Sequence, residues 1–337
     1  MPDAYISQFS GEEIDSTLRA AQIISGASTL AELREKLEIR GDTIPVSAED
    51  STLISEALTK IPTTSGGGVN PNLLDNWYFG RPVNQRGQTE YTGNATYSID
   101  RWWMQYDTTL SIVDGGIKIG GKWDAQQYFD TTLPNATYTL SLLYKDRTGS
   151  DPLRLIAGNR TNGDIIKTAS KDASGILSIT FSTAVLNKVN FGFAGSTDNS
   201  ATIIAIKLEL GDTQTLAHKE NEKWVLNEIP DFGEQLRRCQ RYFVRLTNAY
   251  GYGWTYSSSV ANFLVPLPTT LRANPVVKLT KNGEIQTING SKAVTGFEAK
   301  GIHPNGLAID LHDSANALIS GTPVTWHDSS MDISADL

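Results

Sequence analysis

The sequence predicts a mainly β protein, in which an N-terminal arm of short helices precedes two β-sandwich (jelly-roll-like) domains. Three observations lead to this fold class. Apolar residues recur at helical spacing within residues 1–61. From about residue 70 onward, short alternating apolar and polar runs are divided by Gly, Asn, Asp and Pro, which is typical of strands and turns. The 29 glycines and 12 tyrosines among 337 residues also suit a turn-rich β protein.

The arm at residues 1–61 contains three predicted helices. Ser10–Glu13 and Thr29–Glu32 are capping boxes, in which a hydroxyl and a later carboxylate satisfy free backbone N–H groups. A third amphipathic stretch covers Ser51–Lys60. Helices this short are marginal alone and need a partner surface. Two interpretations stay open: a helical subdomain that packs on itself or on a neighbouring copy, and an attachment arm that docks on another protein.

Residues 62–69 are a predicted linker. Their sequence, Pro-Thr-Thr-Ser-Gly-Gly-Gly-Val, carries no charge and is rich in residues that do not hold a helix or strand. We expect this segment to separate the arm from the β region and to let that region reorient.

Residues 70–212 predict the first β-sandwich. Ser111–Ile119 contains two short apolar runs around Gly115-Gly116, which indicates a hairpin. Several short strands with regular turn signals favour a jelly roll of about eight strands. The other expected strands are Thr137–Tyr144, Leu153–Ile156, Ile176–Phe181, Val189–Phe193 and Thr202–Leu210.

Residues 213–233 are a predicted connector, and residues 234–337 a second β domain. We expect Glu234–Arg238 to form a short helical turn and Cys239–Phe243 to lead into the next strand. Cys239 has no cysteine partner, so we interpret it as a buried packing residue. The expected strands are Arg241–Leu246, Val260–Val265, Pro275–Leu279, Gly306–Leu311 and Pro323–Trp326.

Charge and hydropathy exclude several classes of protein. The net charge is −8, and residues 1–61 hold five cations against eleven anions. An acidic chain is a poor partner for nucleic acid, whose phosphates require Lys and Arg. Met1–Ile6 lacks the cationic start and apolar core of a secretory signal, and no run of about 18 apolar residues predicts a membrane helix. We therefore expect synthesis in the cytoplasm, without membrane insertion.

Short motifs in the chain resemble those of fibre proteins of tailed bacteriophages and prophages (tail, collar or head fibres). Together the motifs cover much of the chain from residue 5 to residue 275, and the last sixty residues carry no motif of this kind. The chain has Leu271 where the family often has Met. The motifs are Phe9–Asp15, Asn72–Gly80, Gln85–Gly87, Tyr97–Trp103, Lys207–Gly211 with Thr215, Glu234–Phe243 and Pro266–Pro275.

The resemblance implies a structural protein of the virion, usually a homotrimer. Residues 1–61 would then attach to other virion proteins, and the distal β domains would be presented to the host. Because the middle domain resembles carbohydrate-binding modules, the resemblance also implies contact with a host cell-surface glycan. The implied location is the virion, after synthesis in the host cytoplasm.

Two groups of aromatic residues are candidate ligand-binding residues, either for glycan or for a subunit interface. Aromatic faces stack on sugar rings, but they also form ordinary cores. Trp103 and Trp123 belong to the first group. In an extended segment Trp102 and Trp103 face opposite sides, so we expect one in the core and the other exposed or at an interface. For any single Trp in this region, the core is the commoner role.

The second group is Tyr250, Tyr252, Trp254 and Tyr256, which alternate with glycine at two positions. Interleaved glycines favour a loop or bulge that displays the rings. A packing patch between subunits of a trimer is the competing interpretation.

No pattern predicts catalysis, a cofactor or a metal site. His218, His303, His312 and His327 lack the tight spacing of metal ligands. A glycosidase needs only two carboxylates, which Glu90, Asp100, Asp114, Asp124 and Asp130 could supply, but no motif defines an acid and a base. We therefore predict a protein without enzymatic activity. A glycan depolymerase or hydrolase is one alternative, and a free lectin is another, which the charged helical arm disfavours.

Overall fold

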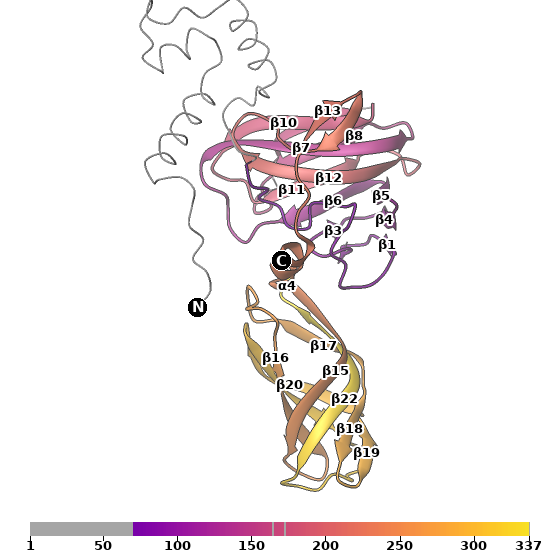
Figure 1. The fold of residues 1–337 in the computed structure, drawn as a ribbon, viewed down its shortest axis with the longest axis vertical. Coiled ribbons are helices and arrows are strands. Elements are labelled where there is room, and N and C mark those ends of the chain that lie inside the picture. Colours follow the sequence, from indigo (N-terminus) through magenta and orange to yellow (C-terminus); the bar gives the residue numbers. More distant parts are fainter. Residues whose placement is uncertain (1–69, 164, 172, 337) are drawn as a thin grey trace, which may run out of the picture. The chain divides into compact units, whose positions relative to one another are not determined.

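A computed structural model describes residues 70–163, 165–171 and 173–336. The predictions for residues 1–61 and for the linker at 62–69 lie outside the described residues, as does the side chain of Trp123. Residues Asn70–Leu337 form one compact unit. Across the described residues the fold is mainly β with one helix, as the sequence predicts (Figure 1).

Two antiparallel six-stranded sheets form the first sandwich. The first sheet has the order β1-β4-β5-β12-β7-β10 and the second has the order β2-β3-β6-β11-β8-β9. The strands are β1 Glu90–Thr92, β2 Thr96–Tyr97, β3 Trp103–Met104, β4 Thr108–Val113, β5 Gly116–Gly121, β6 Trp123–Tyr128, β7 Ala136–Thr148, β8 Leu153–Gly158, β9 Ile165–Lys171, β10 Gly175–Thr183, β11 Lys188–Phe193 and β12 Ser200–Leu210.

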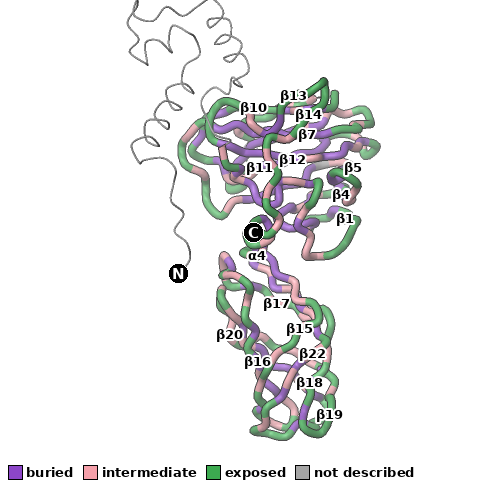
Figure 2. The backbone as a smooth tube through the Cα atoms, in the orientation of Figure 1, coloured by how far each residue is buried: buried purple, intermediate pink, exposed green. Residues whose placement is uncertain are grey.

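Period-two alternation places one face of each sheet in a shared core. In β10, Leu177, Ile179 and Phe181 are buried, while Ser178 and Thr180 between them are exposed. The predicted hairpin is present as β4 and β5, with Val113 paired to Gly116. Figure 2 shows mostly buried residues along β7 and β12, the long strands in the middle of the first sheet.

The expectation of about eight strands in this sandwich was too low, because the described residues contain twelve. Five strands were missed: β1, β2, β3, β6 and β9. Three of them are only two or three residues long, and β6 and β9 offer few apolar side chains to signal a strand. Long-range pairing, not local hydrophobicity, holds them in their sheets.

The predicted connector contains a hairpin that the sequence pattern did not reveal. Strands β13 (Ala217–Glu220) and β14 (Lys223–Leu226) pair across Asn221 and Glu222, both at positive φ. Trp224 lies on β14 and is partly exposed.

Helix α4 spans Phe232–Gln240, with Asp231 as its N-cap. The expectation that Cys239 belongs to the following strand was wrong, because the helix continues through it. One face of the helix packs inward, where Gln235 is buried and Cys239 is fully buried. Burial raises the pKa of the Cys239 thiol well above its usual value, which agrees with a packing role and not with a nucleophile.

The second β region is a single eight-stranded antiparallel sheet around its own core. Its order is β19-β18-β22-β15-β16-β21-β20, and β17 pairs with β22 beside β18. Inward-facing residues such as Phe263, Ile309 and Trp326 form the core. The strands are β15 Phe243–Thr255, β16 Val260–Pro266, β17 Val276–Lys281, β18 Glu284–Thr287, β19 Gly290–Ala293, β20 Gly296–His303, β21 Gly306–His312 and β22 Pro323–Ser334.

Buried charged residues join the sandwich to the second β region; we call this contact the joint. Arg101 Nε lies 3.0 Å from Asp75 Oδ2, and its guanidinium stacks 3.4 Å above the ring of Tyr242. The other oxygen of Asp75 accepts from Arg238 of α4 at 2.7 Å. A carboxylate of the sandwich is thus shared by one arginine from each side.

A third arginine, Arg86, belongs to the joint. Arg86 donates to Asp100 at 2.9 Å and to Asp336, near the end of the chain, at 2.5 Å. Its guanidinium also lies 3.9 Å from the ring centroid of Phe243. Because these side chains come from both β regions and are largely buried, they fix how the two regions meet.

Candidate functional site

Four aromatic side chains form an exposed line along β15, which we call the aromatic stripe. Its members are Tyr250, Tyr252, Trp254 and Tyr256, and each is more than half exposed. The rings of Tyr250 and Tyr252 meet edge to face, with centroids 5.4 Å apart and an interplanar angle of 88°. All four predicted residues therefore lie on the surface, and the structure brings them together.

The stripe lies on a strand and not in a loop. Tyr250 falls within the irregular stretch of the β15–β22 pairing, in partial agreement with the predicted bulge, whereas Tyr252 and Trp254 lie in regular pairing. Gly251 and Gly253 face inward, opposite to the rings. A Cβ on Gly253 would lie 2.3 Å from the backbone oxygen of Asn262 and 2.5 Å from the ring of Phe263. The glycines thus make room for the core beneath the stripe, and the one irregular stretch of the β15–β22 pairing lies before Gly251.

A row of polar side chains runs sideways from the stripe across neighbouring strands. Trp254 is opposite Asn262 on β16, Asn262 is opposite Asp310 on β21, and Asp310 is opposite Glu298 on β20. Asn262 Nδ2 donates to Asp310 Oδ1 at 2.9 Å. Lys300 Nζ lies 2.7 Å from Glu298 Oε2. The polar row therefore consists of groups already held by one another.

An apolar depression of about 590 Å³ lies on the same sheet. Leu264, two residues after Asn262 on β16, is 72% exposed at its wall. Pro266, Gly306 and Ala308 extend the apolar lining, and His303 and Asn305 supply polar groups to it. Leu264 and Ala308 are opposite each other in the register of β16 and β21, so both belong to this face.

Trp103 lies on a different surface, the outer face of the second sheet of the sandwich. Trp102 is fully buried while Trp103 is half-buried, as alternation requires. Trp103 is opposite Gln126, and its ring centroid lies 6.1 Å from that of Tyr128. We call this surface the Trp103 face; it comprises Trp103, Asp124, Gln126, Tyr128, Arg154 and Asn190.

Hydrogen bonds connect the polar members of the Trp103 face. Asp124 accepts from Asn190 Nδ2 at 2.6 Å and from Arg154 Nη2 at 3.1 Å. Gln126 accepts from the Tyr128 hydroxyl at 2.8 Å. Arg160 lies 4.0 Å above the Tyr128 ring. Burial raises the pKa of Asp124, and the charge of Arg154 and the hydrogen bond from Asn190 oppose that effect.

Two buried atoms of this face have no hydrogen-bond partner among the described residues, namely Asn190 Oδ1 and Arg154 Nε. A buried polar atom without a partner costs roughly 1–3 kcal/mol. Such atoms beside a partly exposed Trp are suited to ligand hydroxyls, once the partly exposed Arg154 side chain shifts.

The structure keeps the predicted site residues in two groups. Trp103 belongs to the sandwich, and the stripe belongs to the second β region. Trp123 begins β6, and its side chain lies outside the described part of the structure. Sequence reasoning missed Gln126, Tyr128, Arg154 and Asn190. Alternation around Val189 and Phe191 could have placed Asn190 on an outer face, whereas β6 has only Ala125 to mark its inner face.

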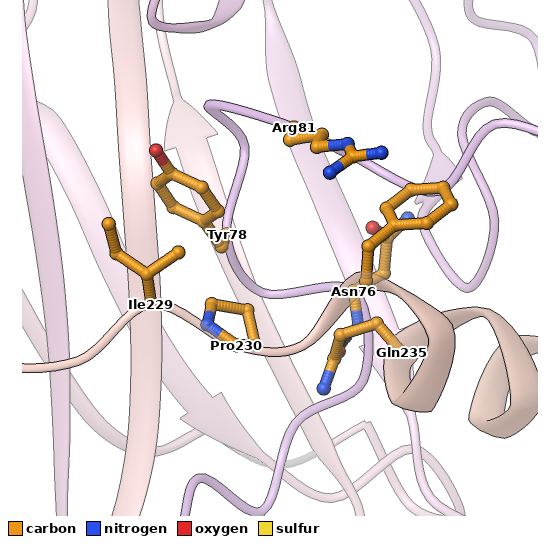
Figure 3. Close-up of a pocket in the computed structure, with 7 residues that line it drawn as sticks. Asn76, Tyr78, Arg81, Ile229, Pro230 and Gln235 are labelled. Atoms are coloured by element: carbon orange, nitrogen blue, oxygen red, sulfur yellow. Dashed lines mark hydrogen bonds between the residues drawn. The ribbon is translucent and has the colours of Figure 1, made fainter.

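A small pocket lies at the joint rather than on either face (Figure 3). Tyr78 and Arg81 of the sandwich, Ile229 and Pro230 of the connector, and Phe232 of α4 line its wall. Its volume of about 70 Å³ suits a few waters more than a sugar. Arg81 lies 4.4 Å from the ring centroid of Phe232, so the pocket is part of the packing between connector and sandwich.

Strongly perturbed carboxyl groups also gather at the joint. Burial raises the pKa of Asp100 to about 6, against the charge of Arg86. Burial likewise raises the pKa of Asp336. Both carboxyl groups are enclosed and bound to Arg86, so this carboxylate pair is placed to hold the joint and not to meet a substrate.

Among the described residues, no group of three or more His, Cys, Asp or Glu side chains is arranged to hold a metal ion. His327 Nδ1 lies 3.0 Å from Asp328 Oδ2 on the surface, which is a local pair. The carboxylate of Asp313 instead accepts from the backbone N–H groups of Ala315 and Ala317. No helix in this part of the chain is long and apolar enough to span a membrane.

No protein-family model and no curated protein matches the chain. Similar solved structures include "BiXyn10A CBM1 APO", at 17% identity over 36% of this chain and 96% of that one, with a TM-score of 0.26. A putative sugar binding protein from Bacteroides thetaiotaomicron is 13% identical over 42% of this chain and 100% of that one, with a TM-score of 0.25. The tandem CBM22 domains of Paenibacillus barcinonensis Xyn10C are 10% identical over 80% of this chain and 99% of that one, with a TM-score of 0.28. These likenesses are too low in identity and TM-score to support a conclusion about the ligand of this chain.

Proposed function

We propose that this chain is a glycan-binding adhesive protein of a phage or prophage appendage, and that its sandwich binds sugar through the Trp103 face. The Trp103 face carries the proposal, because it combines a partly exposed indole with buried polar atoms that lack partners. Sugars need both features: an apolar surface for the C–H face of the ring, and directed hydrogen bonds for the hydroxyls.

The preformed hydrogen bonds of the face support this assignment. Asp124 and Asn190 hold each other in place, so their orientation costs little on binding, whereas Arg154 has to move aside. A carboxylate, an amide and a guanidinium together offer donors and acceptors in fixed planes. This set suits neighbouring hydroxyl groups of one sugar ring.

The appendage role rests on the resemblance to phage fibre proteins. Residues of several motifs that resemble those of phage fibre proteins form hydrogen bonds at or near the joint. Asn76 N donates to Gln235 of α4, and Gln85 Nε2 donates to the backbone oxygen of Phe243. Lys207, fully buried, binds Thr215 and Glu228. A chain whose motifs fasten successive β modules is suited to presenting a binding face away from its attachment point.

A glycan hydrolase is the alternative with a specific candidate, Asp124. Its pKa is raised, as an acid catalyst requires. A glycosidase also needs a second carboxylate at about 5–9.5 Å. The side chains that donate hydrogen bonds to Asp124 are an amide and a guanidinium, which favours binding over hydrolysis.

Glycan binding is tested with the full chain on an array of bacterial surface polysaccharides. Trp103→Ala and Asn190→Ala should each weaken binding about tenfold or more, since a tenfold loss corresponds to about 1.4 kcal/mol. Trp224→Ala, which removes a partly exposed indole from the connector hairpin, is the matched control and should bind like the wild type. Equal binding by all variants would refute the role of this face.

Three further measurements test the rest of the proposal. Release of reducing ends from a bound polysaccharide, abolished by Asp124→Asn, would establish the hydrolase instead. Deletion of residues 1–61 should prevent incorporation into particles, and normal incorporation of the shortened chain would contradict the attachment role. Light scattering should report a trimer, and a monomer at micromolar concentration would contradict the predicted assembly.

A further inference from the structure

We propose that the aromatic stripe, the polar row beside Trp254 and the apolar depression at Leu264 form a second sugar-binding face. Its ligand would be an extended chain of N-acetylated hexosamines. The inference rests on the proposed function, since it gives the chain a second site for the same class of ligand. It concerns a different β region and different residues from the Trp103 face.

The length of the stripe favours a chain over a single sugar. Residues two apart on a strand point to the same side at intervals of about 6.6 Å. Tyr250, Tyr252 and Trp254 follow one another in this way, and Tyr256 continues the series beyond the end of β15. Four exposed rings in series therefore extend over roughly 20 Å, which exceeds the width of one sugar ring.

The polar row supplies the hydrogen bonds that stacking alone lacks. Asn262 lies directly beside Trp254 and is held by Asp310, which is itself buried. Glu298 and Lys300 extend the row on β20. Adjacent strands are about 4.8 Å apart, so Asn262 lies within reach of a sugar stacked on Trp254. Glu298 and Lys300 lie three strands from Trp254, about 14 Å away, where they can meet only a branch or substituent that extends across the sheet.

The apolar depression supports an acetamido substituent. Leu264 is one two-residue step, about 6.6 Å, beyond Asn262 on the same face. A methyl group placed there would gain apolar contact, while His303 and Asn305 could bond the amide. A sugar with a hydroxyl in place of the acetamido group would place no apolar group against the lining of the depression.

A second copy of the chain is the competing occupant, and the polar row disfavours it. Cores of protein interfaces are depleted in charged side chains, because burial removes their hydration. Glu298 and Lys300, both about half exposed, would have to lose water against another protein. A sugar can replace that water with its own hydroxyls.

The experiment measures binding of the full chain to an N-acetylglucosamine tetramer and to cellotetraose, which lacks acetamido groups. We expect the wild type to prefer the N-acetylated tetramer. Trp254→Ala should weaken that binding roughly tenfold, and Leu264→Gln should reduce the preference for it. The matched controls Trp224→Ala and Val276→Gln alter exposed apolar residues elsewhere and should bind like the wild type.

Three outcomes would overturn the inference: unchanged binding by Trp254→Ala, equal affinity for both tetramers, or dissociation of an oligomer by Trp254→Ala in light scattering. The last would assign the stripe to a second copy. Trp103→Ala separates the two proposals. If Trp103→Ala alone loses glycan binding, the proposed function stands and the second face fails. If Trp254→Ala alone loses it, the second face stands and the role of the Trp103 face fails.

Discussion

The joint and the aromatic stripe distribute side chains in opposite ways. In the joint, Arg86, Asp100 and Arg101 are buried and paired, whereas along the stripe the rings of Tyr252 and Trp254 are exposed. Burying charge is costly, and exposing large apolar rings is costly as well, so neither arrangement arises from folding stability alone. The difference teaches that buried charge here specifies how two modules meet, while exposed aromatic area is available for a ligand.

The largest expected effect is at the joint. Arg101→Ala should lower the free energy of unfolding by about 3 kcal/mol or more, because it removes a buried charge partner from Asp75 and the stack on Tyr242. Arg237→Ala is the matched control on the exposed side of α4, where its ion pair contributes at most about 1 kcal/mol. Urea unfolding of both variants measures the contrast. Similar losses for the two would show that the joint does not depend on Arg101.

The floor of the stripe should respond less strongly. Gly253→Ala should cost about 1–3 kcal/mol, because the added Cβ meets the Asn262 backbone and the Phe263 ring. Gly306→Ala is the control, since its nearest neighbour would lie 3.9 Å away, and we expect a change within about 0.5 kcal/mol. Thermal melting of both variants measures the difference. Equal melting temperatures would mean that the core beneath the stripe accommodates the added Cβ without strain.

Asp100 gives the joint a dependence on pH. Its pKa of about 6 in the folded chain exceeds the ordinary value of 3.8, so the folded state favours the protonated form. The stabilising contribution of this group is therefore complete below pH 3.8 and is lost as pH rises through 6. Asp100→Asn should remove this contribution to the pH dependence of folding stability. The difference in melting temperature between wild type and variant from pH 4 to 7 measures it, and a constant difference would rule out Asp100 as its source.

The smallest stability effect is expected on the stripe itself. Tyr252→Ser should change the free energy of unfolding by no more than about 0.5 kcal/mol, because the side chain is 75% exposed. The same variant should weaken binding of the N-acetylglucosamine tetramer several-fold. A destabilisation comparable to that of Gly253→Ala would instead make Tyr252 part of the folding core.

The sequence was a good guide where a property depends on neighbours along the chain. Strands such as β10, β11 and β16 follow from their alternation, and Cys239 was expected to be buried. The end of α4 was misjudged, because Asp231 as N-cap and the inward face of the helix carry it through Gln240. The hairpin of the connector was missed, since it depends on two residues at positive φ that carry side chains.

The candidate sites divide in the same way. Alternation separated Trp102 from Trp103, and the aromatic series at 250–256 was visible as a pattern. The partners of those rings were not visible. Asp124, Arg154 and Asn190 come from β6, β8 and β11, and only the order of strands in the second sheet brings them together.

By itself, the sequence determined the mainly β class, the positions of the strongly alternating strands and the presence of exposed or buried aromatic candidates. These properties follow from period-two patterning and turn residues, which act over a few neighbours. Only the tertiary structure decided the strand order, the composition of the two aromatic faces and the shared carboxylates of the joint. Those depend on pairing between segments as far apart as Arg86 and Asp336, whose meeting no local pattern encodes.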